Sequence, residues 1–426
     1  AFRRGTSVYF PGHVVPMLPF ALSNGICSLN PKVDRLAFSA LMEVDKDGRR
    51  YGAKFAKSVI CSKARMTYNK VNKILAGDKG LREEYAFLVE TAETMNNLAH
   101  ALYKRRIERG ALELDIPEAE IRVDENGKPV EIRFRERGES EKLIEEFMLL
   151  ANTAAASFGL EHELPFLFRV HDNPPSEKIE VFEQSMAEIG FDISELKKGV
   201  TPLALYHILH KARGTKYELI VNNSILRSMA KAQYSANNIG HFGLVIDKYS
   251  HFTSPIRRYP DLLIHRIMSA YLTGMKRENI EKRYRTFVSE AAEKTSMQEV
   301  RAMGIERDCE DCYKAEYMKQ FLGEELDGMI SSIAPHGVYV ELPNTVEGLI
   351  RMEDMPEGEY DTQSKVILQN ATTGRTYIVG DPIRVQVVAC DVSAGNVDFI
   401  PAGTTRKPRP EKGQKPGNRS GRGPRR

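Results

Sequence analysis

The chain has 426 residues, of which 28% are charged and 42% hydrophobic, enough apolar sequence for two or three separate cores. No run of apolar residues approaches the length of about eighteen needed for a membrane span, and the five cysteines are too few and scattered for a disulfide framework. Composition therefore argues against a membrane or disulfide-stapled protein, and we expect a cytoplasmic protein without membrane contact.

The formal net charge is +3, but the charge is unevenly placed. Residues 404–426 hold nine Lys and Arg against one acid, Glu411. Because this segment alone carries +8 against a total of +3, the remainder of the chain is net negative at −5. Residues 403–426 also lack apolar side chains that could offset the entropy of ordering, so we expect a disordered basic tail suited to a polyanion partner.

The chain begins at Ala1 inside a proline-punctuated run, and we expect that residues upstream are missing. Alternating positions predict strands within residues 33–45 and 119–135. Apolar or small residues recur in steps of three and four from Leu81 to Leu102, which predicts an amphipathic helix. A second helix is predicted over 140–158, capped by Ser140 and stopped by Gly159.

Further helices are predicted over 201–214 and in a long helical hairpin made of 260–272 and 277–321. From residue 323 the sequence changes to short β-rich segments separated by turns, and five strands of this kind predict a small barrel ending near residue 402. The expected fold class is α+β: a mixed domain over 1–322, an OB-type barrel over 323–402 and the basic tail over 403–426.

The most informative segment is HFGLVIDKYSHFTSPIRRYPDLLIHR, residues 241–266. Residues 253–255 predict a turn before a helix that starts at Pro260. Arg257 and Arg258 offer forked, permanently charged donors that match phosphate oxygens, and Phe252 and Tyr259 are expected to add aromatic surface beside them. These residue types suit a phosphodiester ligand.

Two residues of the following helix complete this pattern. Asp261 lies in the first turn and His265 one turn later, so the two face the same side and could pair. The alternative from the residues alone is structural: Arg257 would pair with an internal acid, and Asp261 would only cap the helix.

The segment resembles the signature of the RNB family of nucleases, which includes ribonuclease R and ribonuclease II. The matching positions are His241, Phe242, Gly243, Tyr249, Thr253 to Pro255, Arg257 to Tyr259, Asp261 and His265. Similar stretches are RGTSVYFP at 4–11, LSNGICSLNP at 22–31, KARMTYNKV at 63–71 and IEEFMLLAN at 144–152. The resemblance extends from residue 3 to about 320.

The resemblance implies a role for several residues. Arg257 would grip the phosphate near the cleaved bond and stabilise charge in the transition state, with Arg258 as a supporting contact. Tyr68 would stack on the 3′-terminal base, although from the residues alone it reads as a half-buried core tyrosine. Glu146 would position the terminal nucleotide, although by itself it reads as a solvated helix acid. Asp261 and His265 would give structural support.

The family also implies magnesium, held by clustered aspartates that activate water. This cluster precedes the RGTSVYFP motif, so we expect it upstream of Ala1, and Asp34 and Asp45 lack the clustered spacing. We expect no metal ligands in this chain and no zinc at Cys309 and Cys312, which have no second pair. The chain alone is then expected to be inactive.

The β-rich segment resembles the RNA-binding OB domain of the ribosomal-protein S-one type. Tyr339 and His336 would stack on bases, and Arg351 would meet the backbone. The function implied is processive 3′→5′ hydrolysis of RNA to nucleoside 5′-monophosphates by a monomer that takes single-stranded RNA 3′ ends. The alternative is an RNA-binding protein without hydrolytic activity.

Overall fold

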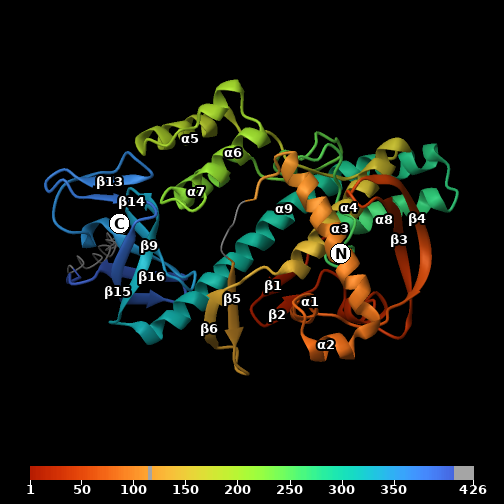
Figure 1. Ribbon diagram of the computed structural model, residues 1–426, viewed down its shortest axis with the longest axis horizontal. Coiled ribbons are helices and arrows are strands. Elements are labelled where there is room, and N and C mark those ends of the chain that lie inside the picture. The colour runs from red at the N-terminus through yellow and green to blue at the C-terminus, as the bar shows by residue number, and fades with distance from the viewer. Residues whose placement is uncertain (114–117, 407–426) are drawn as a thin grey trace, which may run out of the picture.

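The computed structural model describes residues 1–113 and 118–406. In Figure 1 a mixed part of helices and strands lies on the right and a β-rich part on the left, and the long helix α9 (Arg277–Met318) runs from one to the other. The helices α5 (Ser176–Glu188), α6 (Pro202–Ala212) and α7 (Glu218–Ser228) lie along the top, next to the β-rich part. Of the predicted basic tail, residues 407–426 lie outside the described residues.

The N-terminal segment forms two hairpins. A short one pairs β1 (Val8–Phe10) with β2 (His13–Val15), and a π-helical turn, η1 (Ala21–Ile26), follows. A long one pairs β3 (Asp34–Val44) with β4 (Arg50–Cys61) through eleven partner positions. The strand predicted over 33–45 is therefore confirmed, and β4 is a partner that the sequence analysis did not predict.

The helix predicted from Leu81 to Leu102 is two helices. After α1 (Tyr68–Leu75), α2 (Lys79–Glu84) ends at Tyr85, whose φ of −111° and ψ of 32° are not helical, and α3 (Ala86–Glu108) continues the chain. The apolar spacing runs on through the break, so the spacing by itself did not reveal it.

Helix α4 (Glu139–Glu161) extends beyond its predicted limits. Gly159 does not stop it, because this glycine is the point where the helix passes the ring of Phe166: a Cβ there would lie 2.5 Å from Cγ of Phe166. The helix ends at His162 instead, whose backbone N–H bonds to Phe158 O. Ser140 is not the cap either, because the helix begins one residue before it.

By length and apolar composition α4 alone among the described helices could cross a membrane, a test that core helices also pass. In the structure it packs against α3, and its buried residues include Glu146 and Asn152. Those polar side chains are bonded within the fold, as described below, so α4 behaves here as a core helix.

The strand predicted over 119–135 is a hairpin of β5 (Ala119–Val123) and β6 (Pro129–Phe134). Asp124 accepts the N–H groups of Asn126 and Lys128, and Gly127 has a φ of +79°, a conformation that glycine adopts without strain. The turn residues therefore divide the predicted β-region into two antiparallel strands.

The middle of the chain supplies a two-stranded sheet and three helices. Thr201 caps the predicted helix by accepting the N–H of Ala204, and Pro202 is its first residue. The elements in chain order are β7 (Phe168–Val170), α5 (Ser176–Glu188), η2 (Ser194–Lys198), α6 (Pro202–Ala212), α7 (Glu218–Ser228), β8 (Gln233–Ser235) and η3 (Phe242–Leu244). Strand β7 pairs with β8.

The predicted helical hairpin is confirmed: α8 (Tyr259–Leu272) is followed by α9 and the short η4 (Lys319–Phe321). The predicted barrel is also confirmed, with its strands closed in the order β10, β11, β16, β15, β9. They are β9 (Glu325–Ala334), β10 (Gly337–Glu341), β11 (Glu347–Arg351), β15 (Pro382–Asp391) and β16 (Asn396–Pro401). The fold class is thus α+β with a terminal OB-type barrel, as predicted.

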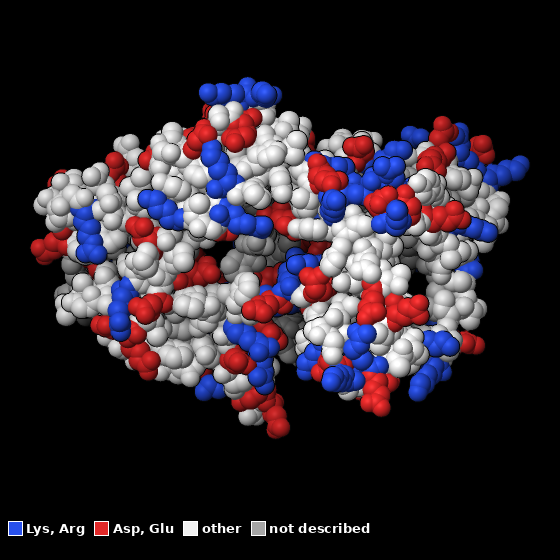
Figure 2. Space-filling model, viewed as in Figure 1, with Lys and Arg blue, Asp and Glu red and all other residues white. Residues whose placement is uncertain are grey.

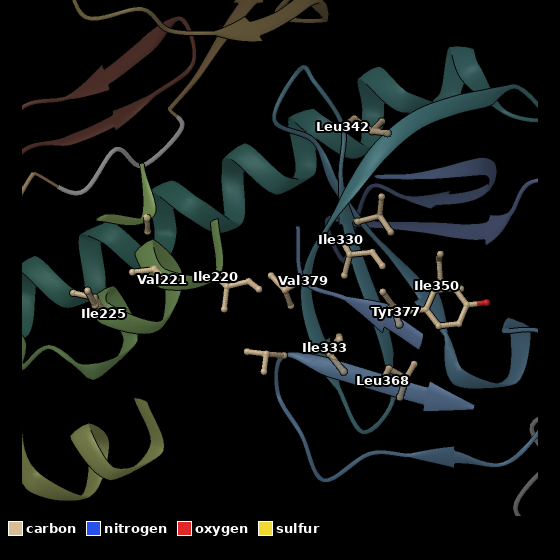
Figure 3. Close-up of a cluster of buried hydrophobic side chains, with 14 of the residues drawn as sticks. Ile220, Val221, Ile225, Ile330, Ile333, Leu342, Ile350, Leu368, Tyr377 and Val379 are labelled. Carbon is tan, nitrogen blue, oxygen red and sulfur yellow. The ribbon is translucent and has the colours of Figure 1, made fainter. Parts of the chain in front are cut away.

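A small sheet that was not predicted is inserted between β11 and β15. It consists of β12 (Tyr360–Asp361), β13 (Ile367–Asn370) and β14 (Thr376–Ile378), after the short turn η5 (Met352–Asp354). Figure 3 shows how this insert closes the core: Leu368, Tyr377 and Val379 face the barrel residues Ile330 and Ile333.

The core has two clusters. One joins the inside of the barrel to α6 and α7; in Figure 3 Ile220 of α7 lies next to Val379, and Ile225 lies farther from the barrel in the same cluster. The other lies between α4, α8 and α9 and includes Phe166, Leu263 and Ile267. Because the first cluster is continuous across the two parts, the barrel is packed against the mixed domain by apolar contact.

Candidate functional site

The predicted turn is formed by residues 254–258, immediately before α8. The N–H groups of Arg257 and Arg258 both bond to the carbonyl oxygen of Ser254, at 3.2 and 3.0 Å. Arg258 is extended, with φ −127° and ψ 124°, and Pro260 occupies the first turn of α8, where its missing N–H costs nothing. The local sequence therefore sets a sharp entry into the helix.

The beginning of the chain holds this turn from the other side. The N–H of Ser7 donates to Arg257 O at 2.9 Å, and the N–H of Tyr259 donates to Gly5 O at 2.9 Å. Gly5 has a φ of +72°, and a Cβ on it would lie 2.8 Å from Cβ of Gln298 on α9. The RGTSVYFP motif thus fixes the backbone of Arg257, although some 250 residues separate the two segments.

The side chain of Arg257 is exposed. Within the part of the chain that the structure describes, it forms no ion pair or side-chain hydrogen bond, while its backbone is held at both N–H and C=O. The alternative that Arg257 pairs with an internal acid is therefore wrong. A fixed backbone carrying an open guanidinium suits an anionic ligand from solution.

The internal pair involves Arg258 instead. Its Nη2 lies 2.8 Å from Oδ1 of Asp261, whose side chain is fully buried, and the same oxygen accepts the N–H of Ser254 at 2.7 Å. Burial by itself would lower the pKa of Arg258, but the adjacent carboxylate outweighs it, and the net shift is upward. Asp261 therefore does more than cap α8: it ties the turn to the helix.

The predicted pairing of His265 with Asp261 is wrong. Nε2 of His265 donates to Phe252 O at 2.7 Å, and the two rings lie 4.4 Å apart. Burial lowers the pKa of His265, which keeps the ring neutral and leaves it one donor for the carbonyl. His265 nevertheless supports the turn, because it holds the strand that leads into it.

The predicted aromatic surface beside the arginines is also wrong. Phe252 is 5% and Tyr259 4% exposed. Tyr259 packs against Phe2, with ring centroids 5.1 Å apart, and Phe252 against Phe55 at 5.3 Å. Burying an aromatic ring in the core stabilises the fold more than leaving it exposed. Tyr259 could therefore stack on a base only if its ring left the core.

Asn152 of α4 supports the same turn and was not predicted as a site residue. It is 2% exposed; its Oδ1 accepts the N–H of Phe252 at 2.9 Å, and its Nδ2 donates to the hydroxyl of Tyr249 at 3.1 Å. A buried amide with both ends bonded fixes the extended segment before the turn. Asn152 ends the IEEFMLLAN stretch, and its polarity on an apolar helix face was the available signal.

A second ion pair lies beside the turn and was likewise not predicted. Nη1 of Arg169, on β7, lies 2.5 Å from Oε2 of Glu299 on α9, and the guanidinium lies 4.7 Å from the ring centroid of Tyr234. The hydroxyl of Tyr234 in turn bonds to Nδ1 of His251 at 2.9 Å. These residues come from four distant segments, so spacing along the chain carried no signal for them.

Tyr68 lies elsewhere, at the start of α1. Its side chain is 45% exposed, so about half of it is open to solvent, and its stacking on a 3′-terminal base stays a prediction. Thr67 caps the helix by accepting the N–H of Lys70, and Ser140 of α4 donates to Tyr68 O at 3.1 Å. Tyr68 lines a pocket of about 930 Å³ together with Tyr9, which follows the segment that fixes Arg257.

Glu146 is not a solvated acid. It is 5% exposed, and its Oε1 lies 2.7 Å from Nη2 of Arg106 on α3. The pKa of Glu146 is raised, because the effect of burial exceeds the opposing effect of Arg106. Glu146 therefore already has a buried partner, and its contact with a terminal nucleotide stays a prediction.

The three barrel residues lie on neighbouring strands β10 and β11 and the turn before them. Nε2 of His336 lies 2.9 Å from the hydroxyl of Tyr339, and their rings are 5.6 Å apart, almost perpendicular. Arg351 is not a free cation, because its Nη2 lies 3.2 Å from Oδ1 of Asp398, which also pairs with Arg406. The pair of an exposed His336 and a partly buried Tyr339 fits base stacking, whereas Arg351 would have to share its charge with Asp398.

Magnesium implied by the family resemblance does not fit the residues at hand. Among residues 1–113 and 118–406, no group of three or more His, Cys, Asp or Glu side chains could hold a metal ion. Asp45 is used in the turn after β3, where it accepts the N–H of Arg49, and Asp34 starts that strand. The described residues thus supply the turn and its arginine but no ligand set for a metal.

Comparison with known proteins places the two parts of the chain in known families. The RNB domain matches residues 1–274, and the S1 RNA binding domain matches residues 319–400. Ribonuclease R 1 of Lactococcus lactis is 41% identical over 94% of this chain and 49% of its own length. Ribonuclease R of Escherichia coli is 38% identical over 96% and 51%. The chain therefore spans about half the length of the curated relatives it matches.

Among solved structures, RNase R of Mycoplasma genitalium in complex with ribose methylated single-stranded RNA superposes with a TM-score of 0.85 at 27% identity. It covers 94% of this chain and 63% of the other. The similarity therefore includes both the mixed domain and the barrel, in the same order.

Proposed function

The chain belongs to the RNB domain family, and from that membership we propose that it carries the substrate-binding part of a 3′→5′ exoribonuclease of the ribonuclease R type. The reaction would remove nucleoside 5′-monophosphates one at a time from the 3′ end of single-stranded RNA. The observation that carries the proposal is Arg257, an exposed guanidinium on a backbone held from both sides.

Arg257 has the chemistry that this reaction needs. A phosphodiester under attack gains negative charge on its free oxygens, and a forked cation placed in advance stabilises that charge without rearranging. The turn is fixed by Gly5, Ser7, Asn152 and Asp261, so the guanidinium is presented from a rigid base. A cation held this way lowers the barrier by favouring the transition state over the bound substrate.

The barrel supplies a second contact with RNA. The S1 RNA binding domain matches it, and the Mycoplasma genitalium relative is described with single-stranded RNA bound. Tyr339 and His336 would stack on bases without regard to sequence, which suits an enzyme that must process any RNA. We further propose that the protein acts in the cytoplasm as a monomer.

We also propose that the complete reaction uses magnesium. When bound it would supply an activated water, but the described residues do not provide its ligands. Hence a second function is proposed for the 426-residue chain by itself: it binds single-stranded RNA without hydrolysing it.

Both proposals can be tested with one 5′-labelled single-stranded RNA of about 20 nucleotides in the presence of magnesium. We expect the 426-residue chain to retard the RNA in a gel without shortening it. A longer protein that adds the aspartate cluster expected upstream should shorten the RNA stepwise from its 3′ end and release mononucleotides. Internal cleavage or shortening from the 5′ end would contradict the exonuclease proposal, and hydrolysis by the 426-residue chain would contradict the second.

A further inference from the structure

A second basic pocket lies apart from the Arg257 turn. It has a volume of about 610 Å³ and is enclosed by the turn between β3 and β4, the end of α3, the middle of α4 and the loop 245–247. No residue of the turn 254–258 lines it. In Figure 2, lysine and arginine side chains gather above the upper part of α3, with acidic ones beside them.

The pocket exists because Gly48 lets the β3–β4 turn approach α3 closely. Gly48 is buried with a φ of +76°, and a Cβ there would lie 3.2 Å from Leu102 N and from Cδ of Arg105. A side chain at this position would meet helix backbone and adopt a strained conformation. Glycine therefore brings Arg49 and Arg50 of the turn to the same pocket as the arginines of α3.

The charges that line the pocket are unbalanced. Five arginines, which are Arg49, Arg50, Arg105, Arg106 and Arg109, face only two acids, Glu146 and Asp247. Of the five, only Arg106 is in an ion pair within the described residues, and its partners are Glu145 and Glu146. Four guanidinium groups thus share one pocket without a carboxylate of residues 1–113 or 118–406 within ion-pair distance.

One of the four, Arg50, is also partly removed from water. Nη1 of Arg50 is buried with no hydrogen-bond partner, while Nη2 makes a long bond of 3.4 Å to Ser157. Burial lowers the pKa of Arg50, and burial together with Arg105 and Arg106 lowers that of Arg109. Like charges at close range cost free energy that a bound anion would recover.

We propose that this pocket binds a phosphate group, held by Arg50, Arg105 and Arg109 as a site separate from the one at Arg257. Phosphate matches the forked donors of arginine, and its charge would compensate the unpaired guanidinium groups. The phosphate can come from an RNA backbone or from a free phosphate ion. The inference goes beyond the proposed function, because it does not depend on RNA hydrolysis.

The first arm of the test uses inorganic phosphate and the 426-residue chain. The melting temperature is measured in sodium phosphate and in sodium chloride of equal ionic strength and pH, for the wild type, for the double variant Arg50→Gln/Arg109→Gln and for Arg227→Gln. Arg227 is an exposed arginine in the last turn of α7, so it controls for the removal of a positive charge. A ligand that binds the folded state raises the melting temperature, and we expect phosphate to do so for all but the double variant.

The second arm uses a fluorescent single-stranded RNA at several salt concentrations. If the phosphate belongs to RNA, the double variant should bind roughly tenfold more weakly than Arg227→Gln, and its salt slope should be smaller by about 0.7 for each RNA phosphate that it no longer neutralises. A defect in the phosphate arm alone would assign the pocket to a free phosphate ion. A double variant that matches Arg227→Gln in both arms overturns the proposal.

A folding defect would not leave the question open. Arg109 is exposed, so Arg109→Gln removes a charge from the pocket without touching the buried nitrogen of Arg50. Arg50→Lys keeps the positive charge but loses the forked donors. If charge decides binding, phosphate should raise the melting temperature of this variant nearly as much as that of the wild type; if donor geometry decides it, the rise should be much smaller. The single variant Arg109→Gln is then compared with Arg227→Gln, and equal behaviour in both arms again overturns the proposal.

Discussion

Nη2 of Arg258 lies 2.8 Å from Oδ1 of Asp261, and this pair joins the turn that presents Arg257 to the first turn of α8. Asp261 is fully buried, so removing its charge would leave the guanidinium of Arg258 without a partner in a site that is largely closed to water. Two neighbouring arginines thus have opposite roles: Arg258 points inward and holds the structure, and Arg257 faces solvent.

The variant Asp261→Asn should destabilise the fold. A buried cation left without its counter-ion costs about 3 kcal/mol in the free energy of unfolding, which urea denaturation measures. The control is Glu281→Gln, which breaks the exposed pair of Glu281 with Arg285 and should cost less than about 1 kcal/mol. Similar losses in the two variants would mean that the Asp261 pair contributes no more than a surface pair.

The variant Arg257→Ala should leave stability unchanged and affect the reaction. In the longer protein proposed above, which would add the aspartate cluster, we expect turnover to fall by roughly a hundredfold or more, with a much smaller change in RNA affinity, because the contact strengthens in the transition state. Single-turnover kinetics and equilibrium binding separate the two effects. Arg227→Ala serves as the charge-matched control, and equal losses of turnover and affinity would make Arg257 a binding residue only.

Asn152 should act through the turn. Replacing it by Leu leaves the buried N–H of Phe252 without an acceptor, and we expect a loss of about 2 kcal/mol in the free energy of unfolding. Tyr249→Phe removes only the hydroxyl that Asn152 donates to, so it should cost about 1 kcal/mol. If the second variant is as damaging as the first, the bond to Phe252 is not the important one.

Stability should fall as the solution becomes acidic below pH 6.5. Burial, with contributions from His171 and Arg169, lowers the pKa of His241 to about 3, and burial lowers that of His171. The unfolded chain therefore binds more protons between pH 6.5 and 3, so the stabilisation is complete above about 6.5 and is lost as the pH falls towards 3. Nδ1 of His171 accepts the N–H of Gly243 at 3.0 Å, a bond that protonation would abolish.

Urea denaturation at several pH values between 7 and 4 tests this dependence. One histidine contributes a slope of up to about 1.4 kcal/mol per pH unit, and His241→Gln should reduce the slope by that amount. His13→Gln replaces an exposed histidine of β2 and serves as the control. A slope that is the same in both variants would show that His241 does not titrate on unfolding.

Tyr339 on the barrel should contribute to RNA affinity. Removing one stacking interaction costs about 1 to 3 kcal/mol, so Tyr339→Ala should weaken binding of single-stranded RNA roughly tenfold, as measured by fluorescence anisotropy. Phe87→Ala removes an aromatic side chain of α3 that is 60% exposed and lies outside the barrel, and it should leave affinity unchanged. Equal affinity in the two variants would contradict a stacking role for Tyr339.

Several elements could be predicted from the sequence because their signals are local. Pro260, the cap Thr201 and the spacing of apolar residues set the helices, and turn residues separate the barrel strands. The RNB resemblance rested on the spacing within residues 241–266 and on four similar shorter stretches, and comparison with known proteins bears it out. The roles of the individual site residues stay predictions.

The sequence alone determined which residue types are neighbours along the chain. The tertiary structure decided which of them face the solvent. Arg257 and Arg258 are equivalent in sequence, yet only Arg258 meets a buried carboxylate. Tyr259 is drawn into the core by Phe2, and Glu146 is paired by a helix forty residues away. Burial and pairing depend on elements packed from distant parts of the chain, and no local pattern records their approach.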